Sequence, residues 1–218
     1  MNLTFGKIFF SLSLVALLSS CGSSSNKSDD ADDSVATQET VVTDEPISST
    51  ETYKDFDWSS VPQSTTAIGT FPYLTAPDGF FIQGKGGYDE SKEGYSEMKD
   101  FYKLIMFNGE SFYNAEGKVA KLKFSMKDKE ADWNQYAFDN SVDKYLLSIG
   151  AKLIGKMKLN RAQIEFLNKD NDMTIYNHIV GDPYNEPVRF YALNRSNAKI
   201  MFQVFSNSAT GEVGVVEL

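Results

Sequence analysis

A long acidic stretch near the start of the chain sets the strongest limit on folding. Residues 22–60 are rich in Ser, Thr and Asp and lack the apolar periodicity of a strand or a helix. Ten acidic residues stand there against Lys27 and Lys54, which gives the stretch a net charge of −8 (2 − 10). Such a composition cannot bury enough apolar surface to offset chain entropy. We therefore predict a disordered tether up to residue 60 and a single folded domain over residues 61–218.

The first 20 residues have the parts of an export signal. Lys7 is their only charged side chain, and an apolar run of 11 residues from Ile8 to Leu18 follows it. This run is too short to span a bilayer, which takes about 20 apolar residues. It has the length of a signal-peptide core, so we predict that residues 1–20 are a signal peptide.

The signal ends in Leu18-Ser19-Ser20-Cys21, which resembles the lipobox of bacterial lipoproteins. Cys21 is the only cysteine, so the chain cannot form an intramolecular disulfide bond. We predict cleavage between Ser20 and Cys21 and attachment of lipid to the Cys21 thiol. An ordinary signal peptide followed by a chance cysteine is the alternative.

Two features near Cys21 bear on where the anchored protein would reside. Gly22 stands where many inner-membrane lipoproteins carry Asp, so the resemblance implies the outer membrane, with the periplasmic side favoured over the cell surface. The acidic residues that follow are interpreted as a soluble spacer, and a signal for export to the surface is the alternative.

The folded part carries little net charge. Residues 61–218 hold 18 basic and 20 acidic residues, a net charge of −2 (18 − 20). The low isoelectric point is therefore mostly a property of the tether. A nucleic-acid partner is not expected, because such proteins concentrate positive charge.

Apolar spacing in residues 61–218 predicts an α+β domain with a mainly antiparallel sheet and two helices. One helix carries Phe138 to Ile149 and ends at Gly150, and a shorter one begins at Asn160 with Gln163 closing a capping box. Gly117 is interpreted as a turn between two strands. The predicted strands cover residues 111–114, 118–126, 151–157, 174–180, 188–193, 199–205 and 212–217.

Residue combinations typical of catalysis are mostly missing, so an enzyme is not expected. His178 is the only histidine, and a structural or surface role is preferred to that of a general base. Cys21 is assigned to lipid, which leaves no thiol nucleophile. We predict no cofactor, and we interpret the many aromatic residues as core, with a ligand groove as the alternative.

Two glycine-rich or acidic runs resemble ligand loops only in part. Gly84-Lys85-Gly86-Gly87 lacks the spacing of a phosphate-binding loop. Asn168 to Asp172 places oxygen atoms at alternate positions, as a calcium loop does. Met173 and Ile179 replace the Gly and the bidentate Glu of that loop, so no metal site is predicted.

The run Gly181-Asp182-Pro183-Tyr184-Asn185-Glu186-Pro187-Val188 is the most unusual segment, and its two prolines predict a defined loop before a strand. It resembles a segment in the N-terminal domain of OmpA-family outer-membrane lipoproteins. Further similar stretches cover residues 61–73, 77–80, 116–119 and 211–217. The resemblance implies an envelope location and a non-catalytic domain. In those relatives a peptidoglycan-binding domain follows, whereas this sequence ends at Leu218, so direct peptidoglycan binding is not expected.

Three functional hypotheses remain open at this stage. The first is a non-enzymatic envelope lipoprotein that binds or supports another envelope protein, with Asp182, Tyr184, Asn185 and Glu186 as the candidate contact loop. The second is a periplasmic hydrolase that uses two carboxylates, which a pocket containing two acids would favour. The third is a small-molecule binder, which a sizeable apolar cavity would favour.

Overall fold

The computed structural model describes residues 53–84, 97–169 and 175–218. The predicted signal peptide, Cys21 and most of the tether lie outside the described residues. Seven strands and three α-helices follow one another, after the short 3-10 helix η1 (Trp58–Ser60). They are β1 (Phe80–Ile82), β2 (Glu97–Phe107), β3 (Phe112–Met126), α1 (Gln135–Ser148), β4 (Lys152–Met157), α2 (Arg161–Leu167), α3 (Ile175–His178), β5 (Val188–Asn194), β6 (Lys199–Ser206) and β7 (Gly211–Glu217).

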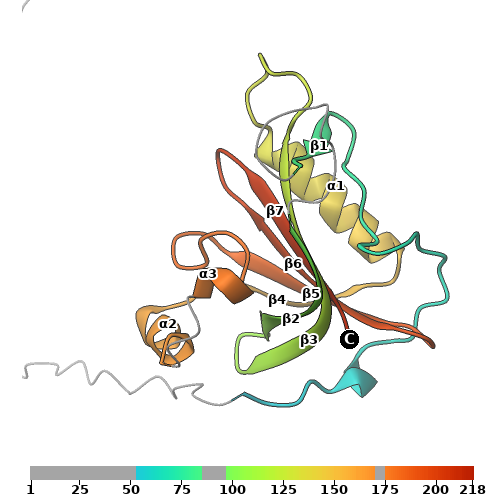
Figure 1. Ribbon diagram of the computed structural model, residues 1–218, viewed down its shortest axis with the longest axis vertical. Coiled ribbons are helices and arrows are strands. Elements are labelled where there is room, and N and C mark those ends of the chain that lie inside the picture. Colours follow the sequence, from blue (N-terminus) through green and yellow to red (C-terminus); the bar gives the residue numbers. More distant parts are fainter. Residues whose placement is uncertain (1–52, 85–96, 170–174) are drawn as a thin grey trace, which may run out of the picture. The chain divides into compact units, whose positions relative to one another are not determined.

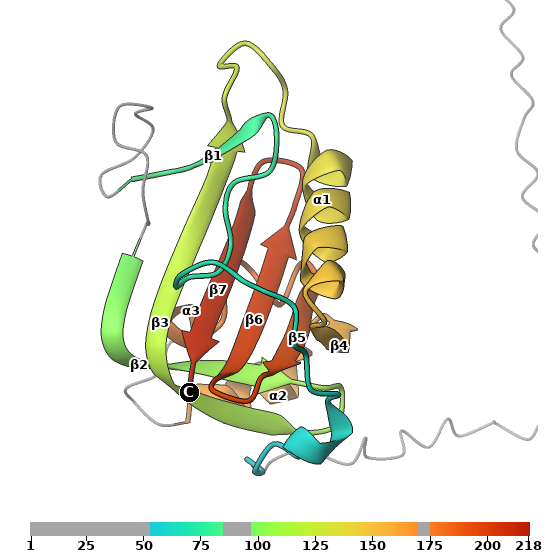
Figure 2. The same cartoon turned by 90° about the vertical axis from the view of Figure 1, so that its right-hand side faces the viewer.

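All seven strands belong to one antiparallel sheet with the order β1-β3-β7-β6-β5-β4, and β2 pairs with β3 beside β1. The α+β prediction is therefore confirmed. In Figure 1 the sheet is seen close to edge-on, with α1 on one side and α2 and α3 on the other. Figure 2 shows β3 curving strongly along its length.

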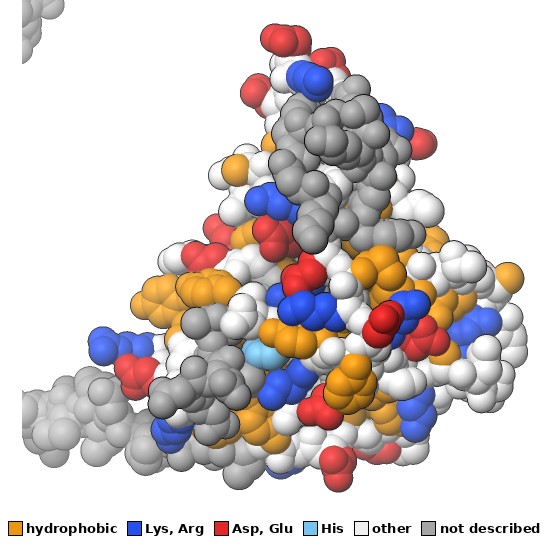
Figure 3. Space-filling view, in the orientation of Figure 1, with side chains coloured by type: hydrophobic (Ala, Val, Ile, Leu, Met, Phe, Trp, Pro, Cys, Tyr) orange, Lys and Arg blue, Asp and Glu red, His pale blue; other side chains and the backbone are white. Residues whose placement is uncertain are grey.

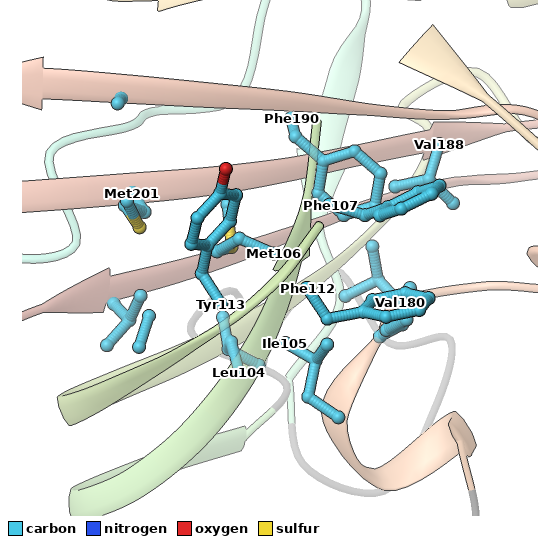
Figure 4. Packing of buried hydrophobic residues seen from close by; sticks show 14 of the residues in the cluster. Leu104, Ile105, Met106, Phe107, Phe112, Tyr113, Val180, Val188, Phe190 and Met201 are labelled. Atoms are coloured by element: carbon cyan, nitrogen blue, oxygen red, sulfur yellow. The ribbon is translucent and has the colours of Figure 1, made fainter. Parts of the chain in front are cut away.

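The sheet is buried on both faces. On one face, α1 packs through Phe138, Val142 and Leu146 onto a cluster that includes Tyr191 and Phe202. On the other, the curved β2–β3 hairpin folds over β5 and β6. Figure 4 shows how residues of that hairpin meet Val188, Phe190 and Met201. Because both faces are covered, β5 and β6 are almost continuously buried, which is unlike the polar and apolar alternation of a half-exposed strand.

Both predicted helices are confirmed, together with the C-terminal end of α1 at Gly150 and the start of α2 after Asn160. The Asn134 side chain caps α1, and Gly150, at φ 85°, follows its last turn. The N–H groups of Gly150 and Ala151 return to the carbonyls of Leu147 and Leu146, which is the hydrogen-bond pattern of a Schellman motif. In α2, Asn160 and Gln163 bond each other's backbone N–H groups as a capping box.

The predicted turn at Gly117 is wrong. Strand β3 runs through this residue without a break, and the reversal lies earlier, where the Asn108 side chain accepts the Ser111 N–H at 2.8 Å. A Cβ atom at Gly117 would lie 2.0 Å from the Glu217 carbonyl oxygen. Gly117 is therefore needed for the close approach of β3 to the end of β7, and the sequence pattern did not separate this role from a turn.

The strand predicted at residues 174–180 is also wrong, although residue 174 itself lies outside the described residues. Ile175–His178 forms the short helix α3, and the Asn168 side chain accepts the Ile175 N–H at 3.0 Å. Ile175, His178 and Ile179 are buried together, and this spacing of three and four is helical. The alternation seen in the sequence was coincidental. Strands β1 and β2, by contrast, were not predicted at all.

The predicted boundary of the tether at residue 60 is too late. Tyr53 forms a parallel bridge with Phe112, and the Lys54 N–H donates to the Phe112 carbonyl at 2.9 Å. Phe56 packs edge-on against Tyr113 with 5.2 Å between ring centroids. Lys152 Nζ donates to the Ser60 carbonyl at 2.8 Å. Aromatic side chains thus hold residues 53–60 on the domain despite the acidic residues between them.

Candidate functional site

His178, the only histidine, has a structural environment. Its side chain is 4% exposed, and its Nδ1 lies 2.9 Å from the Lys103 carbonyl oxygen, so this nitrogen carries the proton and donates. The ring stacks on Tyr102 at 5.2 Å, and Lys99 Nζ lies 3.6 Å from the centroid of that tyrosine ring. Burial, together with nearby Lys103, Lys121 and Lys99, lowers the pKa of His178 although the Lys103 carbonyl opposes the shift. Only a small part of the ring reaches the surface in Figure 3.

Two carboxylates of α1, those of Asp139 and Asp143, are ion-paired with an arginine. Arg189 on β5 is 5% exposed, and its Nη2 and Nε lie 2.6 and 3.1 Å from Asp139 and Asp143 on α1. The Ser206 hydroxyl donates to Asp139 at 2.7 Å and the Tyr191 hydroxyl to Asp143 at 2.8 Å. Burial, reinforced by Asp143, raises the pKa of the Tyr191 hydroxyl well above its ordinary value. This network attaches α1 to the sheet.

The predicted contact loop forms a turn that satisfies its own polar groups. The Asp182 carboxylate accepts the N–H groups of Tyr184 and Asn185 at 3.3 Å each, and the Asn185 side chain donates to it at 2.6 Å. The Glu186 N–H closes the turn on the Asp182 carbonyl at 3.0 Å. Pro183 is buried, and its carbonyl accepts the Leu159 N–H. Tyr184 and Asn185 are the exposed members of the four predicted contact residues, and Tyr184 is 52% exposed.

Gly181 fixes the position of this turn against the sheet. It adopts φ 72°, and a Cβ atom there would lie 2.1 Å from the Phe205 ring. Its N–H donates to a carboxylate oxygen of Glu212 on β7 at 3.1 Å. The turn is thus seated on β6 and β7 through a position that only glycine fits.

A cavity of about 290 Å³ opens beside this turn. Asp182 from the predicted loop lines it, together with residues of five other segments. Lys121 lies on β3, Tyr176 on α3, Phe205 on β6, Thr210 in the β6–β7 turn and Glu212 on β7. The sequence did not indicate these partners, because sheet pairing and the packing of α3 bring them together.

The polar groups that line the cavity differ in whether they already have hydrogen-bond partners within the protein. Lys121 Nζ turns toward α3, where it donates to the carbonyls of Asn177 at 2.6 Å and Tyr176 at 3.3 Å. Burial lowers the pKa of Lys121, and Glu97 opposes that shift. The Thr210 hydroxyl oxygen is buried and has no hydrogen-bond partner among the described residues.

Cavities of similar size lie elsewhere on the domain. One of about 260 Å³ separates residues 56–60 from β4, and one of about 250 Å³ lies beside the loop between β3 and α1. Neither touches the predicted contact loop. We therefore take the turn at residues 181–186 and its adjoining cavity as the candidate site, and call them the turn and the Gly181 cavity.

Other residues considered in the sequence give little further information. Within residues 53–84, 97–169 and 175–218, no three or more His, Cys, Asp or Glu side chains gather as a metal site would require. The Asn168 side-chain oxygen is bonded to Ile175, and residues 170–173 of the calcium-like run lie outside the described residues. Lys85, Gly86 and Gly87 lie outside them as well.

The fold and site define the class of protein only as an α+β domain with a small polar cavity. No protein-family model matches the chain, and no curated protein matches it significantly. Among the helices that the structure describes, none combines the length and the apolarity needed to cross a bilayer.

Proposed function

We propose that this protein is a non-enzymatic lipoprotein of the bacterial outer envelope, whose domain binds or supports another envelope protein. The observation that carries the proposal is Leu18-Ser19-Ser20-Cys21 directly after the apolar run. A diacylated cysteine holds a soluble domain at a bilayer far more firmly than a single acyl chain does. We place the domain on the periplasmic side of the outer membrane.

Two features of the domain support a non-catalytic role. His178 is 4% exposed, and its Nδ1 is bonded to the Lys103 carbonyl of β2, which favours a structural role over that of a general base. Asp139 and Asp143 are bonded to Arg189 and to hydroxyl groups. The carboxylate-dependent hydrolase is therefore the weaker proposal, although Asp182 and Glu212 both line the Gly181 cavity.

The charge distribution argues against a nucleic-acid partner. Red and blue side chains alternate over the face shown in Figure 3, and no single-sign surface forms there. Exposed tyrosines favour a protein partner, because tyrosine is frequent among the residues that contribute most of the binding energy at protein interfaces. Tyr176 and Tyr184, at 58% and 52% exposed, provide them next to the cavity.

The anchor is tested by replacing Cys21 with Ser and comparing it with Ser24→Ala, a control in the same segment. We expect the control to take up labelled palmitate and to fractionate with the outer membrane. The Cys21→Ser protein should do neither and should retain an uncleaved signal. Normal processing and unchanged membrane retention of Cys21→Ser would contradict the proposal.

The contact role is tested by placing a photo-crosslinking amino acid at position 184 in intact cells. Position 136 is the matched control, because Tyr136 is also an exposed tyrosine but lies on α1. We expect a discrete crosslinked envelope protein at 184 and none at 136. Equal labelling at both positions, or none at 184, would count against this surface.

A further inference from the structure

The Gly181 cavity carries an excess of negative charge. Its ionisable lining residues are Lys121, Asp182 and Glu212, which sum to −1 (1 − 2). The Lys121 ammonium already faces two carbonyl oxygens, so much of its charge is compensated within the protein. Glu212 donates nothing and accepts one backbone N–H through one of its two oxygens. The Asp182 carboxylate likewise accepts three hydrogen bonds within its own turn, so the second oxygen of Glu212 is the acceptor left for a bound group.

The apolar part of the lining is aromatic. Phe205 is buried at the base of the turn, where its ring underlies Gly181. Tyr176 is 58% exposed and lines the same cavity from α3. Aromatic faces attract ammonium and guanidinium groups through the negative face of the ring. They also pack against the methylene stem that carries such a group.

One further acceptor has no partner. The Thr210 hydroxyl oxygen is buried, and no described residue hydrogen-bonds to it. Buried hydroxyl groups in folded proteins are normally satisfied by protein, water or ligand. The Asn207 side-chain oxygen cannot serve this hydroxyl readily, because it accepts the N–H groups of Ala209 and Thr210. Because the Thr210 hydroxyl oxygen has almost no accessible surface, a donor that enters the cavity meets Glu212 and not this hydroxyl.

We propose that the Gly181 cavity binds a compact organic cation, namely the guanidinium or ammonium of a side chain on the partner protein. Glu212 is the counter-ion, and Tyr176 is the aromatic wall. At about 290 Å³ the cavity lies at the lower end of the range for small-molecule sites, which suits one side chain. The proposal builds on the binding role above and names the chemistry that the partner must present.

The test uses the full chain in detergent and two small probes. N-acetyl-arginine methylamide carries the guanidinium, and N-acetyl-citrulline methylamide has nearly the same shape without the charge. Nuclear magnetic resonance titrations report affinity and the residues that shift. We expect the arginine probe to bind weakly, to perturb Tyr176 and Gly181, and to bind about tenfold more tightly than the citrulline probe.

Two variants, each with a matched control, identify the side chains of the cavity that bind the probe. Glu212→Gln removes the charge but retains an oxygen for the Gly181 N–H, and Glu110→Gln is the control in the exposed β2–β3 turn. Tyr176→Ala removes the wall, and Tyr136→Ala on α1 is its control. We expect each cavity variant to weaken binding of the arginine probe by about three- to tenfold. The controls should leave the affinity unchanged.

Two results would overturn the proposal. These are no binding of the arginine probe at its solubility limit, and binding of the citrulline probe with the same affinity as the arginine probe. If Glu212→Gln does not fold, as judged by circular dichroism, Tyr176→Ala still decides the question. The anchor experiment on Cys21 is independent of these titrations, so failure of one does not obscure the other.

Discussion

Replacing Gln203 with Met should destabilise the domain severely, because this side chain is fully buried and fully bonded. Its oxygen accepts the Val180 N–H at 3.0 Å, and its nitrogen donates to the carbonyls of Ile105 at 2.7 Å and His178 at 2.9 Å. The side chain is 0% exposed, so water cannot replace these bonds without opening the core. Gln203 therefore ties β6 to β2 and to the end of α3.

The size of the effect follows from the three backbone groups that lose their hydrogen-bond partner, namely the Val180 N–H and the carbonyls of Ile105 and His178. A buried polar group that loses its partner costs about 1–3 kcal/mol, and the extra apolar surface of Met recovers part of the sum. We expect a loss of about 3–5 kcal/mol in the free energy of unfolding. A domain of this size has a free energy of unfolding of about 5–15 kcal/mol. The midpoint of its thermal unfolding falls by about 2–4 °C for each kcal/mol that is lost. The midpoint should thus drop by about 6–20 °C.

Urea and thermal unfolding followed by circular dichroism measure this loss. Gln63→Met is the matched control, because Gln63 is exposed and the same atoms are exchanged. Its free energy of unfolding should change by no more than about 0.5 kcal/mol. If Gln203→Met is as stable as the control, the three hydrogen bonds do not stabilise the domain as argued.

Three further substitutions test separate parts of the structure. Gly181→Ala introduces a Cβ at positive φ against the Phe205 ring and should lower the free energy of unfolding, measured with urea, by about 2–4 kcal/mol. Gly69→Ala is the control, because the space around Gly69 is open, and it should leave the free energy of unfolding nearly unchanged. Asn160→Ala removes the capping box of α2 and should lose about 0.5–2 kcal/mol in the free energy of unfolding, with Ala at the exposed Asn197 as the control. The folded-state pKa of His178 lies below 6.5, so the unfolded chain takes up its proton first and stability should fall as the pH drops below that value. His178→Asn retains a donor for Lys103 and should flatten the pH profile of the unfolding free energy; an unchanged slope would refute this assignment.

Local signals in the sequence were sufficient for much of the fold. The C-terminal end of α1 and the N-terminal end of α2 were predictable because the Gly150 cap and the Asn160–Gln163 box act within a few residues. The hairpin of β5 and β6 followed from two apolar runs around a polar turn. These features depend little on distant parts of the chain.

Other features depend on tertiary contacts and were missed. Gly117 looked like a turn because nothing local shows that the Glu217 backbone passes 2.0 Å from its would-be Cβ. Residues 53–60 looked disordered because their composition is acidic, whereas Phe56 and Tyr53 find aromatic partners on β3. Gln203 interrupts an apolar run, and only the fold of the β2–β3 hairpin shows that it is a buried bonding residue.

The candidate site illustrates the same limit. The turn at residues 181–186 was predictable from its prolines and its Asp182 start. The cavity was not, because Lys121, Tyr176 and Glu212 are far apart in sequence and meet only when β3, α3 and β7 pack together. A search for close spacing therefore identified the turn and missed the lysine, tyrosine and glutamate beside it.

The Gln203 substitution also tests how the open edge of β2 is protected. The carbonyls of Lys103 and Ile105, two residues apart on one edge of the strand, accept hydrogen bonds from His178 and Gln203 instead of from a neighbouring strand. At the other end of the sheet, β4 approaches the β2–β3 hairpin so closely that a Cβ at Gly155 would lie 2.6 Å from the Phe107 carbonyl oxygen. Unprotected strand edges pair with other chains. Gln203→Met should therefore self-associate as well as unfold more easily. Sedimentation velocity at several concentrations, under conditions where the variant remains folded, measures this. We expect dimers or larger species for Gln203→Met and none for Gln63→Met. A folded variant that stays monomeric would mean that α3, and not the side-chain hydrogen bonds, shields the edge.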